Sequence, residues 1–444
     1  MKTNYFVIAA FAAIALFASC DKDNNRTNPE KDTGKATSMK VSLTFPNVSQ
    51  TRATADLNAT DNEAQVNTVD VFIYYTSSGA FASHAHLTAA DFTQRASTGS
   101  ADVYEYTATA KIPTTTGAKS VFAGINLPAS VVDALKNRPA STLASVEQIM
   151  TRAELAGATN FAMFSVQAVN SIFVEDDAAA ANNITLRCQR LVAKVTVETA
   201  NDMVQAGVPG TLSNLEFAIN NFNTKLFMLQ GAPEYRKDPN WASGSFVQTD
   251  FLAAVNADYA PILDRKVIAS PAIGDYTPRY AAENTSEGKL KKEITRVTVR
   301  ATFIPETVWQ GTTGNFNENS SHGIIVPQTF YAVTPSVTEG TFYFFTESIA
   351  DEFAAERGGT KRTYTNGYCY WDIFLGKNPD NIENKWDVLR NDFYKCNITK
   401  IVAPGRPDPE VPDPDVTPED DTSITASIDI LFWHTPVISN YVLE

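Results

Sequence analysis

Alternating apolar and polar residues recur along most of the chain. Segments such as 66–75 (VNTVDVFIYY), 120–126 and 294–304 are rich in β-branched and aromatic residues, and clusters of Gly, Pro or Asn bound many of them. This period of two is typical of strands with one buried face. Helical patterns are few, the clearest being residues 130–139. The pattern therefore predicts an all-β protein with a few short helices, most simply two β-sandwiches.

The first unusual segment lies near the N-terminus. Val41, Leu43 and Phe45 fall on one face of a predicted strand, which a Pro-Asn turn ends. A lone arginine, Arg52, then precedes Ala53 within a run of small and polar residues. Because such runs form open surface loops, we predict a core strand directly followed by a protease-accessible loop. The rival cleavage sites are Arg26, Arg95 and the loop 357–362.

The second unusual segment lies near the C-terminus. Residues 404–421 hold six prolines and seven acidic residues, which predicts a semi-rigid polyproline spacer of roughly 50 Å. The strand pattern beyond it places five apolar residues on one face and an aromatic residue after them: Ile424, Ala426, Ile428, Ile430, Phe432 and Trp433. An unpaired strand of this kind is an aggregation hazard, so it must pair with its own second domain or with a neighbouring molecule. We favour the neighbour, because the spacer would carry the strand away from its own domain.

Together the two segments suggest one mechanism. If a protease cuts after Arg52 and the strand around 41–45 leaves, the first domain is left with an open sheet edge and an apolar slot. The C-terminal strand of another copy has the same alternation and could fill that slot. Repeated head to tail, such contacts build a filament rather than a closed ring.

An export pattern opens the chain. Lys2 precedes an apolar run at 5–17 that is too short to span a bilayer comfortably, and small residues lead to Cys20. The arrangement resembles a bacterial lipobox, with Cys20 as the lipidated residue, although Phe17 departs from the usual aliphatic residue. An ordinary signal peptide is the alternative. The polar segment 21–35 predicts a flexible tether.

Charge and motif content narrow the function. A net charge of −14 argues against nucleic acid as a partner. No HExxH, GxSxG, P-loop or CxxC motif occurs, so we predict neither catalysis nor a cofactor. His84 and His86 could offer two metal ligands from one strand face, but no third ligand is near in sequence, and we predict no metal site. Cysteines beyond Cys20 are odd in number, which argues against a disulfide framework, although Cys369 and Cys396 could pair.

Several short motifs occur in a characteristic order. They are Cys20, Thr51 to Ala53, 119–127 (KSVFAGINL), 161–165 (FAMFS), 190–195 (RLVAKV), Glu283 and Asn284 ahead of 303–305 (FIP), and 389–398 (LRNDFYKCNI) before the C-terminal arm with Trp433. In this order they resemble the major fimbrial subunits (fimbrillins) of Bacteroidales, the shaft pilins of type V pili, over nearly the whole chain. The resemblance implies two transthyretin-like Greek-key β-sandwich domains plus an extended C-terminal strand arm. It also implies a lipoprotein of the outer membrane, cleavage between Arg52 and Ala53 by an arginine-specific protease, and polymerisation with other copies by donor-strand exchange.

The expected organisation combines these segments. It comprises a signal peptide 1–19, a lipidated propeptide 20–52 with a removable strand 41–45, an N-terminal β-sandwich 53–205, a C-terminal β-sandwich 206–403, a Pro/acidic linker 404–421 and a donor-strand tail 422–444. We expect a non-enzymatic structural subunit of a cell-surface fimbria that serves adhesion, with accessory fimbrial subunits as further partners. The alternatives are a tip or anchor subunit, or a monomeric surface lipoprotein that binds glycan or host protein.

Overall fold

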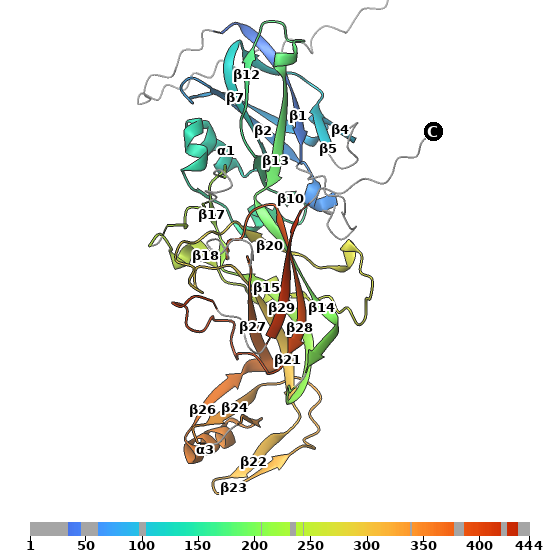
Figure 1. Cartoon of the computed structure of the whole chain (residues 1–444), viewed down its shortest axis with the longest axis vertical. Coiled ribbons are helices and arrows are strands. Elements are labelled where there is room, and N and C mark those ends of the chain that lie inside the picture. The colour runs from blue at the N-terminus through green and yellow to red at the C-terminus, as the bar shows by residue number, and fades with distance from the viewer. Residues whose placement is uncertain are drawn as a thin grey trace, which may run out of the picture. The chain divides into compact units, whose positions relative to one another are not determined.

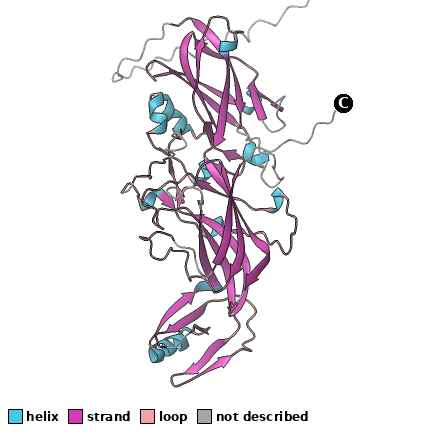
Figure 2. Ribbon diagram, in the orientation of Figure 1, coloured by secondary structure: helices cyan, strands magenta, loops and turns pink. Residues whose placement is uncertain are grey.

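Strands are the predominant element of the described chain, with three short α-helices among them (Figure 2). The computed structural model describes residues 34–45, 61–96, 104–205, 207–230, 237–242, 244–337, 340–376, 386–418 and 424–433. The helices are α1 (Ala129–Lys136), α2 (Arg152–Leu155) and α3 (Glu347–Arg357). Within this part of the chain, no helix is long and apolar enough to cross a membrane.

The largest sheet has ten strands (Figure 1). Its order is β3-β2-β7-β11-β13-β1-β5-β4, with β12 also paired to β7 and β6 to β1. The bounds are β1 (Ala36–Thr44), β2 (Thr68–Tyr75), β3 (Phe81–Thr88), β4 (Phe92–Ala96), β5 (Tyr104–Ala108), β6 (Ile112–Thr115), β7 (Gly117–Ile125), β11 (Met163–Ser165), β12 (Val169–Phe173) and β13 (Asn183–Arg190). Of the described strands, the one nearest the N-terminus, β1, therefore lies inside the sheet and not at its edge.

Burial explains why these segments form strands. In β2 the residues from Val69 to Tyr74 are all buried, so this strand is covered on both faces. Tyr74 donates a hydrogen bond from its hydroxyl to the carbonyl of Leu135 in α1, 3.1 Å away, which satisfies the buried phenol. In β13 the burial instead alternates along the strand, as the period-two pattern predicts.

Two four-stranded sheets share a second hydrophobic core. One has the order β20-β14-β28-β29 and the other β19-β15-β21-β27. Their bounds are β14 (Val192–Gln205), β15 (Gly210–Asn220), β19 (Ala260–Pro261), β20 (Arg279–Ala282), β21 (Arg296–Pro305), β27 (Tyr368–Phe374), β28 (Asp392–Ile401) and β29 (Ile424–Phe432). Strand β29 is an edge strand, because its only partner among the described strands is β28.

Smaller elements complete the described fold. Strands β24 (Phe330–Pro335), β25 (Phe342–Phe344) and β26 (Gly359–Tyr364) form a three-stranded sheet next to α3, and β22 (Val308–Thr312) pairs with β23 (Asn315–Asn319). Three short pairs join β8 (Gln148–Ile149) to β17 (Lys225–Leu226), β9 (Ala156–Gly157) to β10 (Asn160–Phe161), and β16 (Phe222–Asn223) to β18 (Phe251–Leu252). The predicted β-rich class with a few short helices is confirmed, and α1 lies where the helical pattern indicated it. The arrangement as two Greek-key sandwiches with the bounds given above stays a prediction.

Candidate functional site

Strand β1 is held on both sides by neighbouring strands. It pairs in parallel with β13, where Val41 lies opposite Ile184 and Leu43 opposite Leu186. On its other side it pairs antiparallel with β5 at one end and with β6 at the other. Removing β1 would therefore leave unpaired hydrogen-bonding groups on both sides of the gap.

The inner face of β1 fills the hydrophobic core. Met39, Val41 and Leu43 are fully buried and Phe45 is 3% exposed. The ring of Phe45 meets Tyr106 edge to face, with 5.7 Å between the ring centroids. These side chains point the same way because alternate residues of a strand share a face. The predicted removable residues Val41, Leu43 and Phe45 thus lie together in one apolar slot.

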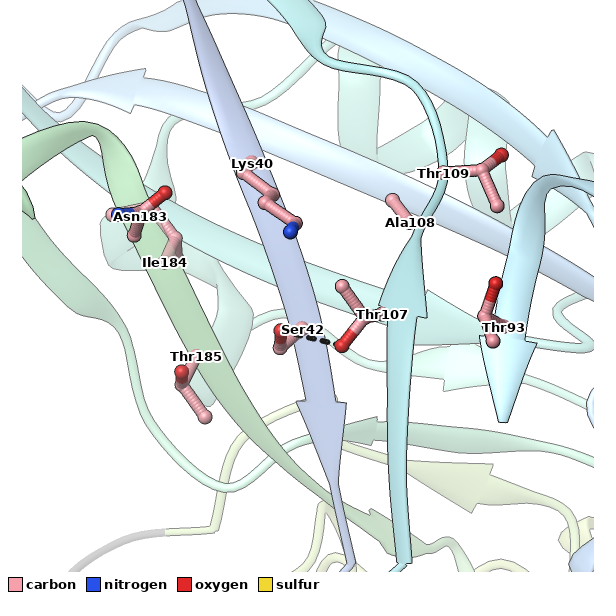
Figure 3. A pocket seen from close by; sticks show the side chains of 9 residues that line it. All are labelled: Lys40, Ser42, Thr93, Thr107, Ala108, Thr109, Asn183, Ile184 and Thr185. Carbon is pink, nitrogen blue, oxygen red and sulfur yellow. Dashed lines mark hydrogen bonds between the residues drawn. The ribbon is translucent and has the colours of Figure 1, made fainter. Parts of the chain in front are cut away.

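The outer face of β1 is polar (Figure 3). Lys40 and Ser42 line a hollow of about 530 Å³ between β13 and β5. The Ser42 hydroxyl lies 3.1 Å from that of Thr107 on β5. Since Lys40 and Ser42 belong to β1, the hollow in this form exists only while β1 is in place.

Cys20, Arg52 and Ala53 lie outside the described residues. Strand β1 ends at Thr44, the described residues continue to Phe45, and the chain is described again from the 3₁₀ turn Asp61–Ala64. The predicted lipidation and cleavage sites therefore remain predictions.

Strand β29 pairs with its own chain (Figure 1). Its antiparallel ladder with β28 runs from Ile424 opposite Ile401 to Phe432 opposite Asp392. Ile424 is buried, and Ala426 and Ile428 are half-buried against the second core. The side chains of Ile430 and Phe432 lie outside the described residues. In this structure the strand thus adopts the pairing with its own chain that the sequence analysis did not favour.

The described part of the Pro-rich segment also packs against the chain. The backbone of Arg406 exchanges two hydrogen bonds with Tyr370 on β27, at 2.8 and 2.9 Å. The Arg406 guanidinium lies 2.9 Å from Asp372, and Lys292 pairs with Asp415. This differs from the predicted free spacer, because the edge strand β27 and a buried carboxylate both need partners.

Trp433 directly follows β29 and is fully buried. Its ring stacks on Tyr280 with centroids 5.7 Å apart, and meets Phe161 edge to face at 5.9 Å. The Arg190 guanidinium lies 4.3 Å from the Trp433 ring centroid, a cation–π contact. We call Phe161, Tyr280 and Arg190 the indole socket.

A buried ion network lies next to the indole socket. The Glu63 carboxylate accepts hydrogen bonds from Lys194 at 3.0 Å and from the Tyr280 hydroxyl at 2.6 Å. The Glu63 carbonyl accepts a hydrogen bond from Nε of Arg190 at 2.9 Å. Burial lowers the pKa of Arg190 to about 10, and the charge of Glu63 opposes that shift. Burial likewise lowers the pKa of Lys194, again against the effect of Glu63.

Sequence reasoning missed this network. Arg190 and Lys194 were noted only as part of a family motif, although two basic residues in the otherwise apolar segment 190–195 are a usable sign of buried pairing. Glu63 carried no such sign, because only the fold brings it to Lys194, 131 residues away.

The histidines and cysteines offer little chemistry. Asp70 lies between His84 and His86, 2.8 and 2.9 Å from their ring nitrogens, a partner that sequence spacing did not reveal. Even so, no group of three or more potential ligands that could hold a metal occurs in the described ranges. Cys188 and Cys369 are buried thiols, and burial raises the pKa of each to about 12.

Comparisons with known proteins agree on one family. The family model for the major fimbrial subunit protein (FimA) matches residues 37–210, and the model for the C-terminal part of fimbrillin, the major fimbrial subunit protein type IV, matches residues 362–437. No curated protein matches the chain.

The solved structures that match the chain include three fimbrial proteins. A fimbrilin from Porphyromonas gingivalis is 12% identical with a TM-score of 0.49, covering 89% of this chain and 98% of its own. A tip fimbrial protein from the same organism is 15% identical with a TM-score of 0.37, covering 89% and 100%. A fimbrial assembly protein from Parabacteroides distasonis is 11% identical with a TM-score of 0.41, covering 90% and 100%. The assignment rests on the two family matches: the chain belongs to the major fimbrial subunit (FimA/fimbrillin) family, whose members are structural proteins and not enzymes.

Proposed function

We propose that this protein is a shaft subunit of a cell-surface fimbria that assembles by strand exchange after cleavage between Arg52 and Ala53. The precursor is a lipoprotein attached to the outer membrane through Cys20. Its partners are other copies of itself, accessory fimbrial subunits and an arginine-specific protease. Family membership supports the fimbrial role and its link to cell adhesion.

The position of β1 is the observation that carries the proposal. A strand that begins at Ala36, close to the start of the described chain, occupies the interior of a sheet and buries four side chains in its core. Burying one such side chain stabilises by about 1.5–3 kcal/mol, so the four together contribute roughly 6–12 kcal/mol before ordering costs. Once β1 has left, the exposed apolar groove between β13 and β5 would be stabilised by another strand that fills it.

Strand β29 has the features of that occupant. It has nine residues, as β1 has, and its apolar residues alternate in the same way. On its own molecule it is an edge strand with a ladder on one side, whereas the slot left by β1 offers ladders on two sides. The exchange therefore gains backbone hydrogen bonds as well as buried apolar surface.

The test treats purified precursor with an arginine-specific protease. We expect a new N-terminus at Ala53 and a ladder of oligomers that withstands detergent and dissociates on boiling. Arg52→Ala should block both, whereas Arg357→Ala, at the exposed last residue of α3, serves as the matched control and should assemble normally. Normal assembly of the Arg52→Ala variant would overturn the proposed processing. A cleaved chain that stays monomeric would overturn the shaft role in favour of a tip, anchor or monomeric binding protein.

A further inference from the structure

The C-terminal strand is fixed at both of its described ends. Ile424 is buried at the start of β29, and Trp433 is fully buried just beyond its end. Between them the described polar side chains, those of Thr425, Ser427 and Asp429, face solvent. Among the described side chains of this segment, Trp433 is the largest that is buried, so we expect its contacts to add to the resistance of the strand to detachment that the ladder with β28 provides.

The contacts of Trp433 belong to a different hydrophobic core from those of Ile424 at the other end of the strand. Trp433 belongs to the first hydrophobic core, whereas Ile424 belongs to the second. The backbone N–H of Trp433 donates a hydrogen bond to the carbonyl of Asn391, and the Trp433 carbonyl accepts a 3.4 Å hydrogen bond from the Arg190 guanidinium. Its indole Nε1 is buried without a hydrogen-bond partner among the described residues. A buried donor left unsatisfied costs free energy, so this N–H reduces the stability that the other contacts of Trp433 give to the docked C-terminal strand.

We propose that Trp433 is a latch, in which the indole socket holds the C-terminal strand on its own molecule until processing, and that Glu63 keeps that socket in place. This inference rests on the proposed strand exchange. Glu63 orients two of the three socket residues, because its carboxylate holds the Tyr280 hydroxyl and its carbonyl holds the Arg190 guanidinium. The same carboxylate compensates the buried ammonium of Lys194.

Glu63 also ties the latch to the predicted cleavage point. It lies in the turn Asp61–Ala64, and in the intact chain the segment before this turn is fixed at its other end by β1. Cleavage after Arg52 makes that segment a free N-terminus and removes the restraint. The entropy gained by a freed chain end then favours movement of the turn and of Glu63. Processing would thus open the acceptor slot and loosen the donor strand in one step.

The latch is tested on monomers by hydrogen exchange of the backbone amides 424–433. In the unprocessed chain, Trp433→Ala should raise their exchange rate at least about tenfold while the amides of β2 keep their protection. The matched control is Trp309→Ala, which removes an aromatic side chain that packs on Phe342 and Phe353 away from the C-terminal strand. Unchanged exchange in Trp433→Ala, or an equal increase in Trp309→Ala, would overturn the latch.

The role of Glu63 is tested by charge. Glu63→Gln leaves the buried Lys194 uncompensated and should also speed exchange at 424–433, whereas the double variant with Lys194→Met should return it toward the wild-type rate. The monomer fraction of protease-treated wild type should exchange faster than the unprocessed chain, and an unchanged rate would overturn the coupling. Since exchange is read on monomers, failure of wild type to polymerise counts against strand exchange, whereas normal polymerisation without a Trp433 effect counts against the latch alone.

Discussion

Replacing Ile428 by cysteine places a thiol directly opposite Cys396 in the ladder between β28 and β29. Directly opposed residues of antiparallel strands have Cα atoms about 4.5–5.5 Å apart, within the range that a disulfide bridges. Both side chains face the second core, so the two sulfur atoms can meet. The disulfide would fasten β29 to its own molecule.

The expected strength of this lock follows from the loop it closes. About 33 residues lie between and including the two cysteines, for which the chain-entropy model gives about 3.7 kcal/mol. Comparing the oxidised with the reduced form of the same variant cancels the cost of the Ile428→Cys substitution. The oxidised form should therefore unfold at a higher urea concentration than the reduced form.

Assembly after proteolysis is the decisive assay. The oxidised variant should be cleaved after Arg52 yet remain monomeric, and a reducing agent should restore the oligomer ladder. Ser427→Cys is the matched control, because residue 427 faces solvent opposite Asn397 and its thiol points away from Cys396. If the oxidised Ile428→Cys chain polymerised as fast as wild type, β29 would not be the strand that leaves, and assembly by exchange of β29 would be ruled out.

Three further predictions concern stability. Leu43→Ala should destabilise the precursor by about 2–5 kcal/mol in urea unfolding and leave the processed subunit unaffected, because that residue is then gone; equal losses in both would contradict this. Arg390→Leu strips the buried Glu283 of its 2.9 Å partner and should cost about 3–5 kcal/mol in thermal unfolding, against about 0.5 kcal/mol or less for exposed Arg357→Leu. Burial raises the pKa of Asp387 to about 7, above its unfolded value of about 3.9. The folded state therefore binds more protons than the unfolded state in this range, and the free energy of unfolding should fall as the pH rises from about 4 to 7. Asp387→Asn should flatten that fall in urea titrations, and an unchanged pH profile would rule out Asp387 as its source.

Local pattern was enough to locate the two strands that matter. The alternation at 41–45 predicted β1, and the alternation from 424 onward predicted β29. Their partners could not be read from the sequence, because pairing depends on which edges the rest of the fold leaves open. Strand β29 pairs with β28 because that edge is free, and the Pro-rich segment turns back because Asp372 and β27 supply partners for Arg406.

The buried charges were still harder to foresee. Isolated in sequence, Glu63 looks like any surface carboxylate, and its burial against Lys194 follows only from long-range packing. The same holds for Trp433, which the sequence places after a predicted strand without indicating the indole socket that receives it. Periodicity reports which face of an element is apolar, whereas the identity of the opposing face is a property of the whole fold.

The parallel pairing of β1 with β13 affects when β1 can join the ten-stranded sheet during folding. The side-chain amide of Asn182 donates to Thr37, 145 residues away in the chain, so the contacts of β1 are strongly non-local. A chain that emerges from its N-terminus presents β1 long before β13 exists to receive it. High contact order slows folding, so we expect β1 to insert after pairs that are local in sequence, such as β2 with β3, have formed.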